Sequence, residues 1–357
     1  MSSSTIPPTA RSSAAQTRSA LPWRSGSATG VGSLPGDDPH EAMRIVVGEL
    51  EGFPHLVELP AVGPSGDMVG RGAAHLLDLH VEVQPSGWRF AAHAGADERR
   101  ARSMLGRDLD VLEEHTQGFT GPLKIQCAGP WTLASSVELH YGDKALADPG
   151  AVRDITTALA EGIAGVVRDV ARRVPGADIV VQLDEPLLPA VLAGQVPTAS
   201  GFSTLRAIDR VAAADKLRTV VDAIVAAGAV PIAHCCARSV PIEVLVNAGV
   251  RAVSLDATLL TERDDDAIGT AVEAGIALFL GLVPSVDIDP LPRVDALVAP
   301  ARALWSRLGF APEHLARDVV VTPTCGLAGS SVAWPRRAYR LCTEVAKVLV
   351  EEPEESK

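Results

Sequence analysis

A histidine and two cysteines lie at the end of one apolar run, in a spacing that suits a metal. Residues 230–236 have the sequence VPIAHCC, which is typical of a buried strand with reactive side chains at its end. Side chains two residues apart on a strand project to the same side, so His234 and Cys236 face one way and Cys235 faces the other. An imidazole and a thiolate on one side can bind zinc or a similar borderline metal.

Another cysteine follows a distant apolar run and offers a third ligand. Cys325 comes shortly after residues 319–323, which have the sequence VVVTP. With His234 and Cys236 it makes a His-Cys-Cys set, and three protein ligands with one open position are typical of catalytic zinc. Asp256, which ends the apolar run between them, is either a fourth ligand or a group that orients one. The competing interpretation is that the cysteines are inert packing groups.

Two carboxylates and a tryptophan follow other apolar runs. The run 178–184 ends in Asp184, and Glu185 comes next. This pair can do acid–base work or bind a cationic amino group, and it can equally cap the helix that follows. Trp131 lies just after the run 124–129, where it either lines a pocket or belongs to a strand-to-helix turn.

Eight apolar runs alternate with helix-like stretches, which predicts a (β/α)8 TIM barrel. Near-continuous apolar runs are typical of a parallel sheet that is covered on both faces. A doubly wound open sheet is the alternative, but no Gly-x-Gly-x-x-Gly motif follows the first run. The active site of a barrel forms at the carboxyl ends of its strands, where all the candidate residues fall. The predicted strands are 28–33, 55–59, 124–129, 178–184, 230–235, 252–256, 276–283 and 319–323, with a β-hairpin inserted near 78–90.

Composition limits the class of protein. The net charge of −12 and the pI near 5.2 argue against a nucleic-acid binder. No apolar run approaches the roughly 20 residues that cross a membrane. Five cysteines, an odd number, indicate a reducing and therefore cytoplasmic setting rather than a disulfide framework. We expect residues 1–27 to be a disordered tail, 28–350 to be one catalytic domain, and 351–357 to be an acidic tail.

From about Gly30 to Val348 the chain resembles the C-terminal catalytic barrel of cobalamin-independent methionine synthases, in a short single-barrel form. The resemblance rests on a set of short motifs in a fixed order. It implies an S-methyltransferase that uses zinc to convert homocysteine to methionine. The motifs are VGSLP (31–35), DMV (67–69), SGW (86–88), GPWTL (129–133), QLDEP (182–186), HCC (234–236) and CGL (325–327).

The resemblance also assigns residues. It implies that His234, Cys236 and Cys325 hold zinc, with Asp256 at the position where the family has a glutamate. Asp256 is one methylene shorter, so its place as a ligand is open. Gly32 and Ser33 match the segment that holds the homocysteine carboxylate. Asp184 matches the acid that holds the substrate amino group.

The chain departs from the family pattern at three positions. No glutamate occurs in 59–64 before the DMV motif, Ala190 replaces a glutamate that contacts folate, and 282–287 lacks the expected catalytic histidine. The methyl donor is therefore open between a folate and a corrinoid, which a partner protein can carry. Two alternatives also stay open: a metal-free barrel similar to uroporphyrinogen decarboxylase, whose GPWTLA-like segment the chain shares, and a zinc-binding barrel without turnover.

Overall fold

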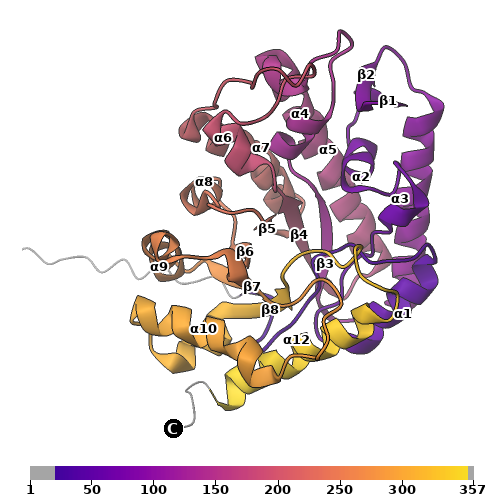
Figure 1. The fold of residues 1–357 in the computed structure, drawn as a ribbon. Coiled ribbons are helices and arrows are strands. Elements are labelled where there is room, and N and C mark those ends of the chain that lie inside the picture. Colours follow the sequence, from indigo (N-terminus) through magenta and orange to yellow (C-terminus); the bar gives the residue numbers. More distant parts are fainter. Residues whose placement is uncertain (1–20, 353–357) are drawn as a thin grey trace, which may run out of the picture.

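Six parallel strands curl around the centre of the molecule in the computed structural model, which describes residues 21–352 (Figure 1). They follow one another in sequence order around the sheet. Three coincide with the predicted runs, and the ends of the others differ from the predicted ends by at most three residues. The strands are β3 (Gly121–Ala128), β4 (Ala177–Asp184), β5 (Val230–Cys235), β6 (Ala252–Asp256), β7 (Ala277–Val283) and β8 (Val319–Pro323).

The first two predicted strands are extended segments that pair only through isolated bridges, so the prediction of regular strands there was wrong. Glycine weakens strand pairing, and the backbone at Gly30 lies so close to His55 that an added β-carbon would be 2.2 Å from its Nε2. The segments nevertheless close the barrel. Thr29 N donates to Val321 O of β8 (3.0 Å), Glu58 N donates to Gly32 O (3.2 Å), and Leu56 N donates to Lys124 O of β3 (2.8 Å). The predicted (β/α)8 barrel is thus confirmed.

Alternation along the strands separates an outer apolar layer from the barrel interior. On β5, Ala233 packs in the layer beneath the helices, whereas Ile232 packs in the interior. Three aromatic rings fill the amino-terminal floor of the barrel, where Phe279 lies 5.1 Å from Trp23 and 5.9 Å from Phe53 between ring centroids. Trp23, which belongs to the predicted tail 1–27, is only 7% exposed. Residues 1–20 and 353–357 of the predicted tails lie outside the described residues.

Buried polar side chains lie above this floor, toward the carboxyl ends of the strands. They alternate with the outward apolar residues, and the strand register places them side by side around the interior. This polar layer separates the apolar floor from the mouth of the barrel. Its members are Lys124, Gln126, Gln182, Asp184, His234, Ser254 and Thr322.

Helices surround the curled sheet (Figure 1). Asp38 and Asp148 cap α1 and α5 through their side chains, and a proline stands at the first position of each helix, as the sequence predicts. Arg340 of α12 pairs with Glu49 of α1 at 2.8 Å, which joins the last helix to the first. The α-helices are α1 (Pro39–Glu49), α2 (Met68–Ala74), α3 (Ala96–His115), α4 (Pro130–Ser136), α5 (Pro149–Arg173), α6 (Leu188–Ala193), α7 (Arg210–Ala226), α8 (Ile242–Asn247), α9 (Asp265–Glu273), α10 (Val294–Leu308), α11 (Leu315–Asp318) and α12 (Trp334–Glu351).

Shorter elements complete the fold. The predicted hairpin is confirmed as the antiparallel pair β1 (His80–Gln84) and β2 (Gly87–Ala91). None of the helices in 21–352 is long and apolar enough to cross a membrane. The 3-10 helices are η1 (Pro60–Val62), η2 (Ala145–Ala147), η3 (Ala257–Leu259), η4 (Glu262–Asp264) and η5 (Pro312–His314).

The aromatic floor yields a test of what holds the barrel together. Phe279→Ala should lower the free energy of unfolding by about 3–5 kcal/mol, because it leaves a cavity between Trp23 and Phe53. The matched change Phe202→Ala, at a side chain that is 97% exposed, should alter it by less than about 0.5 kcal/mol. Guanidinium unfolding followed by circular dichroism measures both. Equal effects would show that the floor is not a stabilising core.

Candidate metal centre

His234, Cys236 and Cys325 meet at the carboxyl ends of two strands that are not neighbours in the sheet. His234 lies near the end of β5, Cys236 directly follows that strand, and Cys325 lies just after β8. The ligand atoms of the three side chains all lie within 4.8 Å of one another. The two sulfur atoms are 3.1 Å apart. The fold therefore brings together the three residues that the sequence predicts as zinc ligands.

The imidazole of His234 is oriented by a hydrogen bond at one ring nitrogen, and its other ring nitrogen has no hydrogen-bond partner among the described residues. Its Nδ1 lies 2.9 Å from the Ser254 hydroxyl on β6. Its Nε2 is buried and has no hydrogen-bond partner among the described residues. A buried nitrogen without a partner is costly in a folded protein. A metal ligand whose second nitrogen is held by a neighbouring group has this arrangement, so the donor set fits zinc.

The two thiols of the group differ from the other cysteines in their chemistry. The hydrogen bond with Cys236, together with a smaller contribution from His234, lowers the pKa of Cys325 to about 4. The same hydrogen bond, together with burial, raises the pKa of Cys236. The pair thus readily gives up one proton, and metals bind the thiolate form. Cys235 faces outward, and burial raises the pKa of its thiol to about 12. Burial also raises the pKa of Cys127 well above its usual value.

Ser33 lies beside the metal-binding group because a glycine leaves room for it. A β-carbon at Gly326 would lie 2.1 Å from the Ser33 hydroxyl oxygen. Leu327 N donates a hydrogen bond to Ser33 O at 2.8 Å. The neighbouring Gly32 is buried, and its carbonyl accepts from Glu58 N. Ser33, one of the predicted substrate-binding residues, therefore lies against Gly326, the residue that follows Cys325.

Asp184 lies inside the barrel at the end of β4, in register with His234 of β5. Gln182 Nε2 donates to its Oδ1 at 2.7 Å. Burial raises the pKa of Asp184 to about 7, opposed by His234 and Lys124. For Lys124, burial lowers the pKa to about 8, and the negative charges of Asp184 and Glu58 oppose this effect. Both groups therefore titrate close to neutral pH.

Lys124 is a site residue that the sequence did not reveal, because it lies within an apolar run. It is fully buried, and its Nζ donates to Val31 O at 2.7 Å and to Gln126 Oε1 at 3.3 Å. The predicted strand 124–129 begins at Lys124, but the observed strand β3 begins three residues earlier and so encloses it. A lysine inside a buried strand needs an acidic or carbonyl partner within the protein.

Glu58 is the second missed residue, and it lies one position before the stretch 59–64 in which the sequence shows no carboxylate. It ends the second extended segment and lies close enough to Asp184 and Lys124 to influence both pKa values. Its Oε1 is 3.2 Å from Arg71 Nε of α2. Arg71 also pairs with Asp108 of α3. Although burial opposes its charge, the two carboxylates raise the pKa of Arg71.

Glu185 and Trp131 are held away from the metal-binding group. Glu185 is fully buried, and its carboxylate accepts from Trp131 N (2.9 Å), Thr132 N (2.8 Å) and the Thr132 hydroxyl (2.7 Å). Glu185 thus caps α4, the helix that follows β3, rather than α6, the helix that follows Glu185 in the sequence. The Trp131 indole donates to Ala213 O of α7 at 3.1 Å and is buried. A β-carbon at Gly129 would lie 2.3 Å from Glu185 Oε1, so this contact needs glycine.

Asp256 ends β6 and is not part of the metal-binding group in the structure. Its Oδ1 accepts from Thr258 N at 2.9 Å and from the Thr258 hydroxyl at 2.6 Å, which caps η3. The structure thus gives this carboxylate a local partner, and its predicted role as a fourth ligand stays a prediction.

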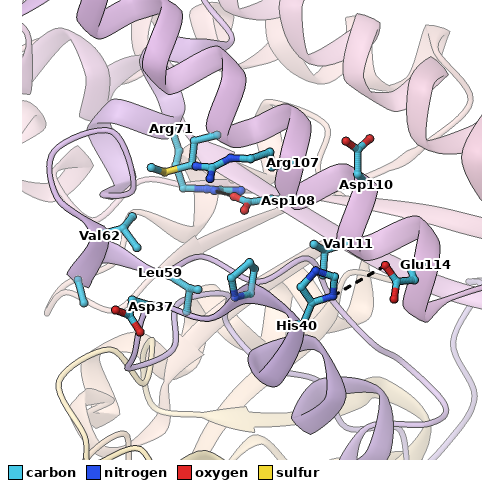
Figure 2. A pocket seen from close by; sticks show the side chains of 13 residues that line it. Asp37, His40, Leu59, Val62, Arg71, Arg107, Asp108, Asp110, Val111 and Glu114 are labelled. Carbon is cyan, nitrogen blue, oxygen red and sulfur yellow. Dashed lines mark hydrogen bonds and ion pairs between the residues drawn. The ribbon is translucent and has the colours of Figure 1, made fainter.

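A cavity of about 790 Å³ lies outside the barrel, between the start of α1, η1 and α3 (Figure 2). Arg71 lines it and also contacts Glu58. Arg71 thus joins the lining of this cavity to the buried Glu58 through an ion pair. Figure 2 shows His40 and Glu114 at another part of its lining.

Residues 27–348 match the family described as the cobalamin-independent synthase catalytic domain. None of the curated protein sequences matches the chain. Among solved structures, the chain is similar to a B12-independent methionine synthase from Shewanella sp. W3-18-1 in complex with selenomethionine, at 11% identity and a TM-score of 0.57, over 91% of this chain and 98% of that one. A methylaspartate ammonia lyase from Clostridium tetanomorphum also matches, at 11% identity and a TM-score of 0.46, over 91% of this chain and 59% of that one. The first likeness supports the fold, and the second is too distant to support any argument.

The buried group of Glu58, Arg71 and Asp108 yields a second prediction. Arg71→Met should lower the free energy of unfolding at pH 7 by about 3–5 kcal/mol, because it leaves two carboxylates buried without their cation. Removing the cation raises the pKa of the Asp108 carboxyl in the folded state, because Arg71 opposes the effect of burial on it. Protonation then favours the folded variant, so its deficit should shrink as the pH falls from 7 toward 4 and grow as the pH rises.

The matched control is Arg99→Met, on the exposed part of α3, which should change the free energy of unfolding by less than about 0.5 kcal/mol. Denaturant unfolding at pH 5 and pH 7 measures both variants. A pH-independent deficit for Arg71→Met would mean that packing, rather than charge pairing, explains the contribution of Arg71.

Proposed function

The chain belongs to the family of cobalamin-independent synthase catalytic domains and is a methionine synthase-like methyltransferase; on this premise we propose that it uses zinc to transfer a methyl group to homocysteine. The observation that carries the proposal is the meeting of His234 Nε2 with the thiols of Cys236 and Cys325. Family membership favours this function over the decarboxylase-like alternative.

His234, Cys236 and Cys325 are the residues that would hold zinc, in the three-ligand set typical of catalytic rather than structural sites. When bound there, zinc would supply Lewis acidity that lowers the pKa of a thiol coordinated to it. A hydrogen bond that His234 Nδ1–H donates to the Ser254 hydroxyl oxygen would leave Nε2 unprotonated and fix the direction in which it points. Cys235 stays outside the set because it faces the helices.

Ser33 and Asp184 would hold the amino-acid end of homocysteine. The Ser33 hydroxyl lies beside Cys325, where it can donate to the substrate carboxylate. The Asp184 carboxylate, in register with His234, can accept from the substrate ammonium. Holding both groups fixes the sulfur relative to the methyl donor. Lys124 favours the ionised form of Asp184 against the effect of burial, and Glu185 positions the Gly129–Thr132 turn without touching the substrate.

The methyl donor is the open part of the proposal. The absence of a histidine in 282–287 and the alanine at 190 weaken the case for a folate donor and favour a corrinoid, free or on a partner protein. The same absence supports a second candidate function, a barrel that binds zinc and the thiol without turnover. Zinc-loaded protein should form methionine from homocysteine with methyltetrahydrofolate polyglutamate or with methylcobalamin. No product with any donor would favour the second candidate.

Zinc content tests the proposed ligand set. The wild type should hold about one tightly bound zinc per chain. Cys236→Ala and Cys325→Ala should each lose it, because two remaining ligands bind zinc weakly. Cys235→Ala is the matched control, since it alters a neighbouring cysteine that faces outward, and it should keep full occupancy. Elemental analysis after dialysis against a weak chelator measures all four proteins.

Two outcomes bear on this prediction. Full zinc in both Cys236→Ala and Cys325→Ala would refute the site. X-ray absorption should also show one more sulfur in the zinc shell, at about 2.3 Å, when homocysteine is added. An unchanged shell would separate zinc binding from thiol binding and leave only the metal part of the proposal standing.

The charge of Lys124 yields a prediction on pH. Lys124→Met should raise the pKa of Asp184 above about 7, because it removes the cation that opposes burial. If the pKa rises by about one unit, the ionised fraction at pH 7 falls from about one half to about one tenth, so the KM for homocysteine should rise roughly fivefold. The difference should become small toward pH 8.5, where Asp184 is mostly ionised in both proteins.

Lys144→Met is the control for Lys124→Met, because Lys144 is also paired with a buried carboxylate, that of Glu138, at 3.3 Å, away from the metal-binding group. Initial rates between pH 6 and 9 measure the profile of each protein. A uniform loss of activity without a shift of the profile would assign Lys124 to packing alone.

A further inference from the structure

A second group of metal-binding side chains lies on the surface, where α1 and α3 meet. His40 is the second residue of α1, and Glu114 and His115 are the last two residues of α3. One ligand atom of each lies within 4.8 Å of the others. Figure 2 shows His40 and Glu114 facing each other at the edge of the cavity between the two helices. None of the three belongs to the barrel mouth.

The spacing of the two imidazoles matches that of zinc ligands. His40 Nδ1 and His115 Nε2 are 3.4 Å apart. Two Zn–N bonds of about 2.0–2.1 Å at a tetrahedral angle place their nitrogens roughly 3.3–3.4 Å apart. The Glu114 carboxylate lies 3.9 Å from His40 Nδ1, and its exposed side chain is free to move closer. An exposed imidazole pair gains little from its own hydrogen bond in water.

The carboxyl end of α3 favours a cation at this place. His115 and Glu114 stand there, where the helix dipole attracts positive charge. His40 stands at the start of α1. The nearest basic residue along α1, Arg44, is paired with Glu41 at 2.7 Å. Two imidazoles and one carboxylate form a ligand set that zinc accepts.

We propose that His40, Glu114 and His115 form a second site for a borderline divalent cation such as zinc, which ties α1 to α3. Because α1 follows the segment that carries Ser33, the ion would brace the start of the chain against a helix from another part of the sequence. The inference is independent of the methyl-transfer proposal, since it uses none of the residues of the metal centre.

Titration of the metal-free full chain tests this site. The wild type should bind two zinc equivalents. His40→Asn and His115→Asn should each weaken the second equivalent more than about tenfold, since even residues that only orient a ligand are worth that much. The matched control His140→Asn, at an exposed loop histidine outside the group, should keep both equivalents.

Two further measurements separate this site from the metal centre. The double variant Cys236→Ala, Cys325→Ala should keep one equivalent, and cobalt bound to it should lack the thiolate charge-transfer band that the first wild-type equivalent shows. Zinc should raise the unfolding temperature of this double variant but not when His40→Asn is added. Failure of the double cysteine variant to bind any zinc, or a second wild-type equivalent that persists in both histidine variants, would overturn the proposal whether or not the metal centre binds zinc.

Discussion

Every charged group inside the barrel must find a partner away from water, and this requirement orders the carboxyl ends of the strands. Lys124 is held by a carbonyl and a glutamine side chain, and Asp184 is held by Gln182. Glu58 is held by an arginine that also reaches α3. Moving any one of them would leave a neighbour with a buried, unmatched charge. The polar layer therefore fixes the strand ends that carry the thiols and the free imidazole nitrogen.

The two-residue period of a strand explains why so much of the site could be predicted from the sequence. Apolar runs located β5, β6 and β8 to the residue, and the alternation within 230–236 separated Cys236 from Cys235. The sequence also placed His234 and Cys325 at strand ends. A parallel barrel gathers such ends at one face, so position along the chain was enough.

The remainder depended on contacts that no local pattern encodes. Glu185 caps α4, a helix more than 50 residues earlier in the chain, whereas a local reading of the sequence points to the helix that follows. Trp131 turns toward α7 because a carbonyl there accepts from its indole. Glu58 was missed because the strand that carries it is only an extended segment, whose end is set by hydrogen bonds to two neighbours rather than by its own composition.

The ligands of the metal centre lie far apart in the sequence, and this separation has a consequence for the synthesis of the protein on the ribosome. Cys325 is 89 residues from Cys236, so at about 5–20 residues per second the first half of the metal centre exists for several seconds before the second half is made. During that interval β8 is also absent, and the segment at Thr29 has no strand to close upon. During that interval the nascent chain therefore holds only two of the metal-binding residues, His234 and Cys236. The metal centre is complete only when the final strand has been made and closes the barrel.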